Sequence, residues 1–213
     1  MKLNLSQQME LFDPGLARPV TVIGAGSVGS QVVLMLAKLG ATDITAWDAD
    51  SVESHNIPMS AYGPEHLGRY KVEALRDLVL AQTGIEISIR RQMYNGEPLR
   101  SSVVCCVDTM AARSLIFEQV NNNPLVDLFV DTRTSEEYLE VYSVRPCYAD
   151  ETRQYAKLLY PDSTALRFMC GKHGVIYVTS LTAAVAVSRL TTAWKGGKNK
   201  WRFRFQVGSL TSV

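Results

Sequence analysis

A glycine-rich turn between a short apolar run and an amphipathic segment constrains this chain more than any other feature. Residues 19–23 (PVTVI) form a β-branched run that leads directly into Gly24-Ala25-Gly26-Ser27-Val28-Gly29. Beyond the turn, apolar side chains recur at helical spacing as far as Gly40, a typical helix stop. The sequence therefore predicts a strand, a tight turn and a helix. Glycines at such a turn let a phosphate group approach backbone N–H groups at the helix N-terminus.

The rest of the chain alternates between strand-like and helix-like segments. Strands that alternate with helices imply right-handed βαβ units, so the sheet should be mostly parallel with helices on both faces. We expect an α/β fold of the doubly wound, Rossmann-like type, in which ligands bind outside the carboxyl ends of the strands. The expected strands are residues 19–23, 43–47, 85–89, 103–107, 125–130, 138–144 and 201–206, and the expected helices are residues 28–39, 65–83, 110–120, 151–159 and 174–194.

Composition indicates one globular unit. Apolar residues make up 46% of the chain and charged residues 20%, close to the globular average. We expect a single domain over residues 1–213, with a polar leader at 1–18 and a basic, aromatic strand within 195–213. The first twenty residues lack the apolar core of a signal peptide, and four scattered cysteines suit a reducing compartment, so we expect a cytoplasmic protein. Residues 174–194 contain too many polar side chains for an uninterrupted membrane span and should form a buried helix.

Charge balance argues against a nucleic-acid or membrane-surface role. The 22 lysines and arginines nearly equal the 21 aspartates and glutamates, so the chain offers no global field to attract polyanions. Residues 195–204 form a local basic stretch interleaved with Trp201 and Phe203. This stretch is either a contact for acidic protein or RNA, or a solvated strand face whose aromatic side chains point inward.

Polar residues follow several of the predicted strands. Asp48, about 20 residues beyond the glycine turn, occupies the position from which an acidic side chain accepts hydrogen bonds from ribose hydroxyls. Asp50, Asn56, Lys71 and Asp108, with Arg113 beyond them, suit a triphosphate and Mg²⁺. Each has a simpler alternative: Lys71 as a solvated helix charge, Asn56 as a turn residue, and Asp108 as a helix N-cap.

Taken in order over about residues 19–194, these motifs resemble the ThiF, MoeB and HesA family, the bacterial relatives of ubiquitin-activating enzymes. The resemblance rests on residues 24–29 as the family's glycine turn, Asp48-Ala49-Asp50-Ser51-Val52 as D-x-D-x-V, His55-Asn56 in place of Ser-Asn, Gly68 with Lys71 as G-x-x-K, and Val107-Asp108-Thr109 with Arg113 as T-D-N followed by Arg.

The resemblance implies an ATP-dependent adenylyltransferase that activates the C-terminal carboxylate of a ubiquitin-like or sulfur-carrier protein with a glycine-ended tail. It implies ATP and Mg²⁺ as cofactors and a homodimer as the assembly. The implied roles are Asp48 on the ribose, Asn56 and Lys71 on the phosphates, Asp108 as a metal ligand, and Gly24, Gly26, Ser27, Gly29 and Asp50 as further nucleotide contacts. Lys71 and Asp108 would also be catalytic.

Several positions depart from the family pattern. Met59 and Ser60 stand where the family carries Arg and Gln, and the leader lacks the family's arginine-bearing segment, for which Arg18, Arg69, Arg133 and Lys172 are possible substitutes. Cys147 lacks the second cysteine of a C-x-x-C pair, so we expect no zinc site. These losses leave open a non-catalytic nucleotide-binding partner protein of the same fold. An NAD-dependent oxidoreductase is a more distant alternative, because no hydride-transfer constellation is evident.

The cysteines receive different interpretations. Cys170, just before the long apolar helix, resembles the position where some family members carry a reactive cysteine, and we count it as a candidate catalytic residue. The alternative is a small buried apolar side chain. Cys105 and Cys106 fall within a predicted strand and should belong to the core, while Asp131 and Arg133 at the end of the next strand could contact a carrier tail, a phosphate or only each other.

Overall fold

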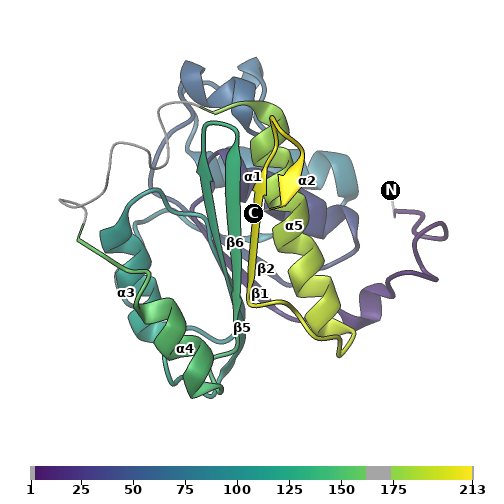
Figure 1. Cartoon of the computed structure of the whole chain (residues 1–213). Helices are drawn as coiled ribbons and strands as arrows, with labels where there is room; N and C mark the ends of the chain where they lie inside the picture. The colour runs from purple at the N-terminus through teal and green to yellow at the C-terminus, as the bar shows by residue number, and fades with distance from the viewer. Residues whose placement is uncertain (1–2, 162–173, 213) are drawn as a thin grey trace.

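The computed structural model describes residues 3–161 and 174–212, which form an eight-stranded sheet with helices on both faces (Figure 1). The strand order is β3-β2-β1-β4-β5-β6-β7-β8. The strands are β1 (Val20–Ile23), β2 (Ile44–Trp47), β3 (Ser88–Arg90), β4 (Ser101–Cys105), β5 (Val126–Ser135), β6 (Tyr138–Val144), β7 (Arg202–Gln206) and β8 (Thr211–Ser212). The helices are α1 (Ser27–Lys38), α2 (Lys71–Thr83), α3 (Met110–Val120), α4 (Ala149–Ala156) and α5 (Ile176–Trp194), with short 3₁₀ turns η1 (Pro14–Leu16), η2 (Ser54–Met59) and η3 (Pro64–His66).

The sheet has a parallel half and an antiparallel half. Strands β3, β2, β1, β4 and β5 pair in parallel, as the βαβ rhythm predicts, and the α/β prediction is confirmed. From β5 onward the pairing is antiparallel. The chain turns back after β5 to form β6, and β7 and β8, which follow α4 and α5 in the chain, pair beside β6. Figure 1 shows the tall β5–β6 hairpin standing beside α5. The strands predicted at 138–144 and 201–206 are present as β6 and β7, but the sequence did not predict their antiparallel pairing.

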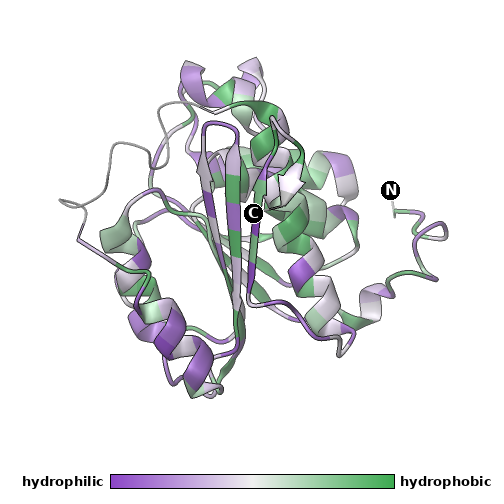
Figure 2. Cartoon of the chain, in the orientation of Figure 1, coloured by the Kyte–Doolittle hydropathy of each residue, from purple (hydrophilic) through white to green (hydrophobic). Residues whose placement is uncertain are grey.

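Helices α1, α2 and α5 lie on one face of the sheet and α3 and α4 on the other (Figure 1). The first layer is aliphatic, with α5 packed against α1, β5 and β6. The second is aromatic: the rings of Phe117 and Tyr155 lie 4.6 Å apart, and Phe129 meets Tyr155 edge-on at 5.3 Å. Figure 2 shows that α1 and α5 contain many hydrophobic residues, and those that are buried belong to the core on this face of the sheet.

Helix α5 is the long apolar segment noted in the sequence. By length and composition alone it could cross a membrane. In the fold, however, one face carrying Val178, Ala183, Ala186 and Leu190 is fully buried against the sheet and α1. The predicted helix is present, but only one of its faces is buried, whereas we expected a buried helix.

Several predicted boundaries were wrong. Helix α2 begins at Lys71 instead of residue 65, because Pro64–His66 form a 3₁₀ turn and Gly68 has a positive φ of 78°. Strand β4 covers Ser101–Cys105 instead of 103–107, so Cys106 lies beyond its end. Strand β5 continues to Ser135 because antiparallel β6 pairs with its second half. Helix α4 spans Ala149–Ala156 instead of 151–159.

Candidate functional site

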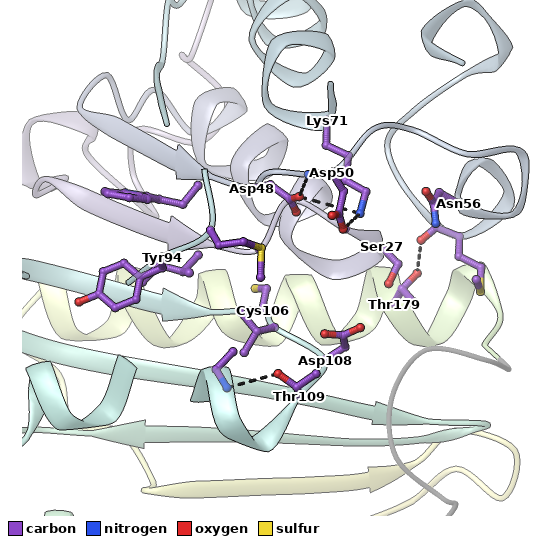
Figure 3. A pocket seen from close by; sticks show the side chains of 18 of the residues that line it. Ser27, Asp48, Asp50, Asn56, Lys71, Tyr94, Cys106, Asp108, Thr109 and Thr179 are labelled. Carbon is purple, nitrogen blue, oxygen red and sulfur yellow. Dashed lines mark hydrogen bonds and ion pairs between the residues drawn. The ribbon is translucent and has the colours of Figure 1, made fainter. Parts of the chain in front are cut away.

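A cavity of about 350 Å³ opens at the carboxyl ends of β1, β2 and β4 (Figure 3). This volume lies within the range typical of small-molecule sites. Its lining comes from the glycine turn, the loops after β2 and β4, the starts of α2 and α3, and the start of α5. The position is the one at which open α/β sheets bind ligands, as the sequence predicts.

The glycines of the turn meet different requirements. Gly24 has φ +93°, and a Cβ there would lie 2.5 Å from the Cys106 carbonyl oxygen. A Cβ on Gly29 would lie 1.8 Å from the Gly24 oxygen, so Gly29 is required by packing and does not line the cavity. A Cβ on Gly26 would meet nothing within 4 Å. Gly26 and Ser27 line the cavity at the N-terminus of α1, where first-turn N–H groups lack intrahelical partners and attract anions.

Asp48 connects the glycine turn to the end of β2 through hydrogen bonds. Its carboxylate accepts hydrogen bonds from the Ala25 N–H at 2.7 Å and the Asp50 N–H at 2.8 Å. Burial raises the pKa of Asp48, against the opposing charge of Lys71 and these two hydrogen bonds. A carboxylate has about four lone-pair sites, so Asp48 retains acceptor capacity for ligand hydroxyls.

Lys71 is the first residue of α2, and its side chain points into the cavity (Figure 3). The Nζ atom lies 2.8 Å from Asp50 Oδ2 and 4.0 Å from Asp48 Oδ1. The Lys71 side chain is 11% exposed, whereas that of Asp50 is 65% exposed. A cation at a helix N-terminus is disfavoured by the helix dipole, and the two carboxylates offset that cost. The interpretation of Lys71 as a solvated helix charge is therefore wrong.

Asp108 and Asn56 reach the cavity from opposite sides (Figure 3). Asp108 is exposed in the loop after β4. The N-cap of α3 is Thr109, whose hydroxyl accepts from the Ala112 N–H at 3.3 Å, so the N-cap alternative for Asp108 is wrong. Asn56 lies in η2, where its Oδ1 accepts from the Glu53 N–H at 3.0 Å. Asn56 is thus a turn residue and also part of the lining.

Within residues 3–161 and 174–212, no group of three or more His, Cys, Asp or Glu side chains is placed to bind a metal ion. Asp50 and Asp108 nevertheless line the same cavity. In nucleotide sites Mg²⁺ is commonly bound through one or two carboxylates together with phosphate oxygens and water. The residues present therefore fit a magnesium ion that arrives with a nucleotide.

Comparison with known proteins identifies the family. The ThiF family model matches residues 16–195. The chain belongs to the ThiF family. It is similar to ubiquitin-like modifier-activating enzyme 5 of Caenorhabditis briggsae, with 31% identity over 118 residues that cover 46% of this chain and 27% of that protein. The chain thus matches only about a quarter of that relative's length.

Solved structures share the fold at low identity. The crystal structure of PaaA aligns with a TM-score of 0.74 at 14% identity, over 94% of this chain and 64% of that chain. E. coli MccB, crystallised with AMPCPP and MccA, aligns with a TM-score of 0.71 at 16% identity, again over 94% of this chain and 64% of that one. These likenesses support the ThiF-family fold and say nothing by themselves about chemistry.

Arg113, which follows Asp108 in the pattern shared with the ThiF family, does not line the cavity. Arg113 is fully buried, and its Nε donates to Asp131 Oδ1 at 2.7 Å, while Arg133 Nε donates to Asp131 Oδ2 at 2.8 Å. Burial alone would raise the pKa of Asp131, but the two arginine charges hold it below the usual value. Arg113 also donates to Val107 O at 2.7 Å and Thr132 O at 3.1 Å. We expected Arg113 near a phosphate, but it braces the loop that carries Asp108.

Arg18, Arg69 and Arg133, three of the possible substitutes for the missing family arginines, do not line the cavity either. Arg133 contacts Asp131 and is buried with Arg113, so the interpretation as a surface ion pair is wrong. Arg18 pairs with Asp127 at 2.8 Å, beside the amino ends of β1 and β5, and Arg69 pairs with Asp77 of α2. Cys170 and Lys172 fall outside the described residues, and their roles stay predictions.

An apolar wall completes the cavity and was missed by the sequence analysis. Trp47 and Tyr94 meet edge-on with ring centroids 5.5 Å apart, and Met93 lies beside them in the lining. Residues 92–94 follow β3 as a loop without periodicity, so only their place after a strand could have indicated them. Cys106 packs against the core, as predicted, and also lines the cavity, which the sequence did not indicate. Burial raises the pKa of its thiol to about 12.

Two arginines of the basic stretch near the C-terminus form ion pairs with one carboxylate. Arg202 and Arg204 of β7 both pair with Glu140 of β6. Phe203 and Phe205 alternate with them and pack against the α5 side of the core. This arrangement matches the strand-face interpretation better than an RNA contact.

Proposed function

We propose that this chain binds ATP with Mg²⁺ in the cavity and transfers its adenylyl group to the C-terminal carboxylate of a ubiquitin-like protein, sulfur-carrier protein or peptide. The observation that carries the proposal is the convergence of Gly26, Asp48, Lys71 and Asp108, from four separate segments, on one cavity. Family membership supports it, as do the name of the matched activating enzyme and the AMPCPP and MccA present in the MccB crystal.

The lining suggests how a nucleotide would lie. The apolar wall of Trp47, Met93 and Tyr94 suits a purine base. Asp48, at the end of β2, would accept hydrogen bonds from the ribose hydroxyls. The phosphates would then extend towards Gly26 and Ser27 at the N-terminus of α1. Lys71 and Asn56 flank this part of the cavity (Figure 3).

The reaction requires attack on the α-phosphorus. A carboxylate oxygen of the carrier forms a bond to this phosphorus while the bond to the bridging oxygen of pyrophosphate breaks, giving an acyl-adenylate and free pyrophosphate. Negative charge grows on the departing pyrophosphate, so Lys71 would stabilise the transition state. Asp108, with Asp50, would hold Mg²⁺, which neutralises phosphate charge when bound.

The test is exchange of labelled pyrophosphate into ATP, measured with Mg²⁺ and a panel of glycine-ended carriers and peptides. We expect carrier-dependent exchange and a Tm that rises with ATP more than with NAD. Failure to bind ATP, or preferential stabilisation by NAD, would contradict the proposal and favour an oxidoreductase.

A nucleotide-binding partner without turnover is the second candidate. Among the described residues that line the cavity, Lys71 is the only lysine or arginine, and Met59 lies at the position of the family's arginine. This candidate predicts ATP binding without pyrophosphate exchange for any carrier. Homodimerisation and a cytoplasmic location stay predictions.

A further inference from the structure

Tyr62 lies behind the cavity, between η2 and η3, and is 4% exposed. Its hydroxyl oxygen lies 2.7 Å from the carbonyl oxygen of Ala25 and 3.1 Å from that of Lys71. One buried hydroxyl group thus contacts the main chain of the glycine turn and of the first turn of α2. These are two of the segments from which the proposed phosphate-binding groups come.

The contact with Ala25 fixes the orientation of a peptide group. In a planar trans peptide the carbonyl and the following N–H point in opposite directions. Because Tyr62 holds the Ala25 carbonyl, the N–H of Gly26 is directed away from Tyr62, and Gly26 lines the cavity. Asp48 holds the N–H of Ala25 at 2.7 Å, so this residue is bound through both of its main-chain polar groups.

The contact with Lys71 acts on the second segment. The N–H of Lys71 donates to the Asp50 carbonyl at 2.8 Å, while its own carbonyl lies against Tyr62. The hydroxyl has one proton, so its contact with the Lys71 carbonyl at 3.1 Å is the weaker branch of a hydrogen bond shared with the Ala25 carbonyl at 2.7 Å. The main chain at Lys71 is thus contacted on both sides, and the Lys71 side chain extends into the cavity from there. Burial, and then the charge of Asp48, raise the pKa of Tyr62 well above its usual value, so the hydroxyl stays a donor.

We infer that Tyr62 is a positioning residue for nucleotide phosphates, which sets the Gly26 N–H and the Lys71 main chain at the spacing that a triphosphate requires. The inference rests on the proposed function. It predicts a larger effect on the phosphates than on the nucleoside, because Tyr62 forms no described hydrogen bond with the apolar wall and reaches Asp48 only through the main chain of Ala25.

The test compares Tyr62→Phe with Tyr155→Phe. The control also removes one buried tyrosine hydroxyl, since Tyr155 is 0% exposed and its hydroxyl has no hydrogen-bond partner in the described part of the chain. Dissociation constants for ATP with Mg²⁺ and for adenosine are measured by calorimetry. We expect Tyr62→Phe to weaken ATP binding about three- to tenfold, the range for one lost hydrogen bond, and to leave adenosine binding within about twofold. Tyr155→Phe should change neither.

Hydrogen exchange supplies a readout that needs no nucleotide. The amide of Ala25, which donates to Asp48 at 2.7 Å, should exchange faster in Tyr62→Phe than in the wild type or in Tyr155→Phe. A purely structural role would lower the Tm and weaken ATP and adenosine equally, and that result overturns the inference, as does unchanged ATP binding. A wild-type chain that binds adenosine but not ATP overturns the proposed function and the inference together, whereas ATP binding that Tyr62→Phe leaves intact overturns only the inference.

Discussion

Replacing Arg113 by methionine should test whether the buried arginine cluster stabilises the fold. Arg113 and Asp131 are both 0% exposed, and their contact is 2.7 Å long. Removing one partner of a buried ion pair leaves an uncompensated charge and typically costs about 3–5 kcal/mol. Arg133 still contacts Asp131 at 2.8 Å, so we expect a loss near the lower end, about 3 kcal/mol. Urea unfolding of wild type and variant measures this difference.

The chain contains a matched control for this experiment. Arg18 and Asp127 form the same type of contact at 2.8 Å, but their side chains are 53% and 31% exposed. Arg18→Met should therefore cost less than about 1 kcal/mol, because water solvates the aspartate that remains. If Arg113→Met costs no more than Arg18→Met, burial does not control the energetics of the cluster and the reasoning is refuted.

The pH dependence provides a second check. The pKa of Asp131 is held below 3.8 in the folded chain by its two arginines, so this carboxylate adds stability above the unfolded pKa. That contribution disappears as the pH falls through the folded pKa, because protonation removes the ion pairs. The difference in unfolding free energy between wild type and Arg113→Met should therefore be largest near pH 7 and should decrease below pH about 4. A difference that widens in acid would contradict this assignment.

Further predictions concern the cavity. Lys71→Ala should abolish pyrophosphate exchange and weaken ATP binding by at least about tenfold while leaving adenosine binding intact, since a charge-assisted contact is worth about 1.5–3 kcal/mol. Gly26→Val should block ATP binding measured by calorimetry with little change in Tm, because a Cβ at Gly26 meets no other atom within 4 Å. Gly29→Ala should lower the Tm, because a Cβ at Gly29 collides with the backbone. Equal effects of the two variants on the Tm would contradict the assigned roles. Iodoacetamide at pH 8 should modify exposed Cys147 well before Cys106, whose pKa of about 12 keeps it a thiol; faster labelling of Cys106 in peptide maps would be the contrary result.

The sequence predicted those parts of the site that depend on local patterns. The glycine turn, the position of Asp48 after β2 and the place of Lys71 in an amphipathic helix are short-range features. The fold brings them together at one edge because parallel strands share their carboxyl ends. Asp108 was predicted by the same rule. These residues needed only the strand order and direction that the βαβ rhythm supplies.

The parts that the sequence did not reveal depend on long-range pairing. The apolar run of residues 103–107 carries no signal for where the strand ends, so Cys106 was assigned to the core and its place in the cavity lining was missed. The continuation of β5 beyond Asp131 depends on β6 pairing with it, and no periodicity in β5 itself indicates an antiparallel partner. Tyr94 joins the cavity only because β3 lies beside β2, which places the following loop next to Trp47.

Two ion pairs of nearly equal length differ in burial, and this difference decides whether the pair stabilises the fold or can open to bind a ligand. Lys71 contacts Asp50 at 2.8 Å and Arg113 contacts Asp131 at 2.7 Å. From the sequence, Lys71 and Asp50 were candidate nucleotide contacts, Arg113 was one of the polar groups that suit a triphosphate, and Asp131 was part of a charged pair near the site. Asp50 is 65% exposed, so water can replace the lysine and the pair can open at little cost when a phosphate enters. Asp131 has no such access, and breaking its pair would leave a buried charge. The buried pair therefore holds the loop that carries Asp108. In the other pair the partner of the lysine is exposed, so Lys71 could leave Asp50 and contact a phosphate, as the proposed function requires.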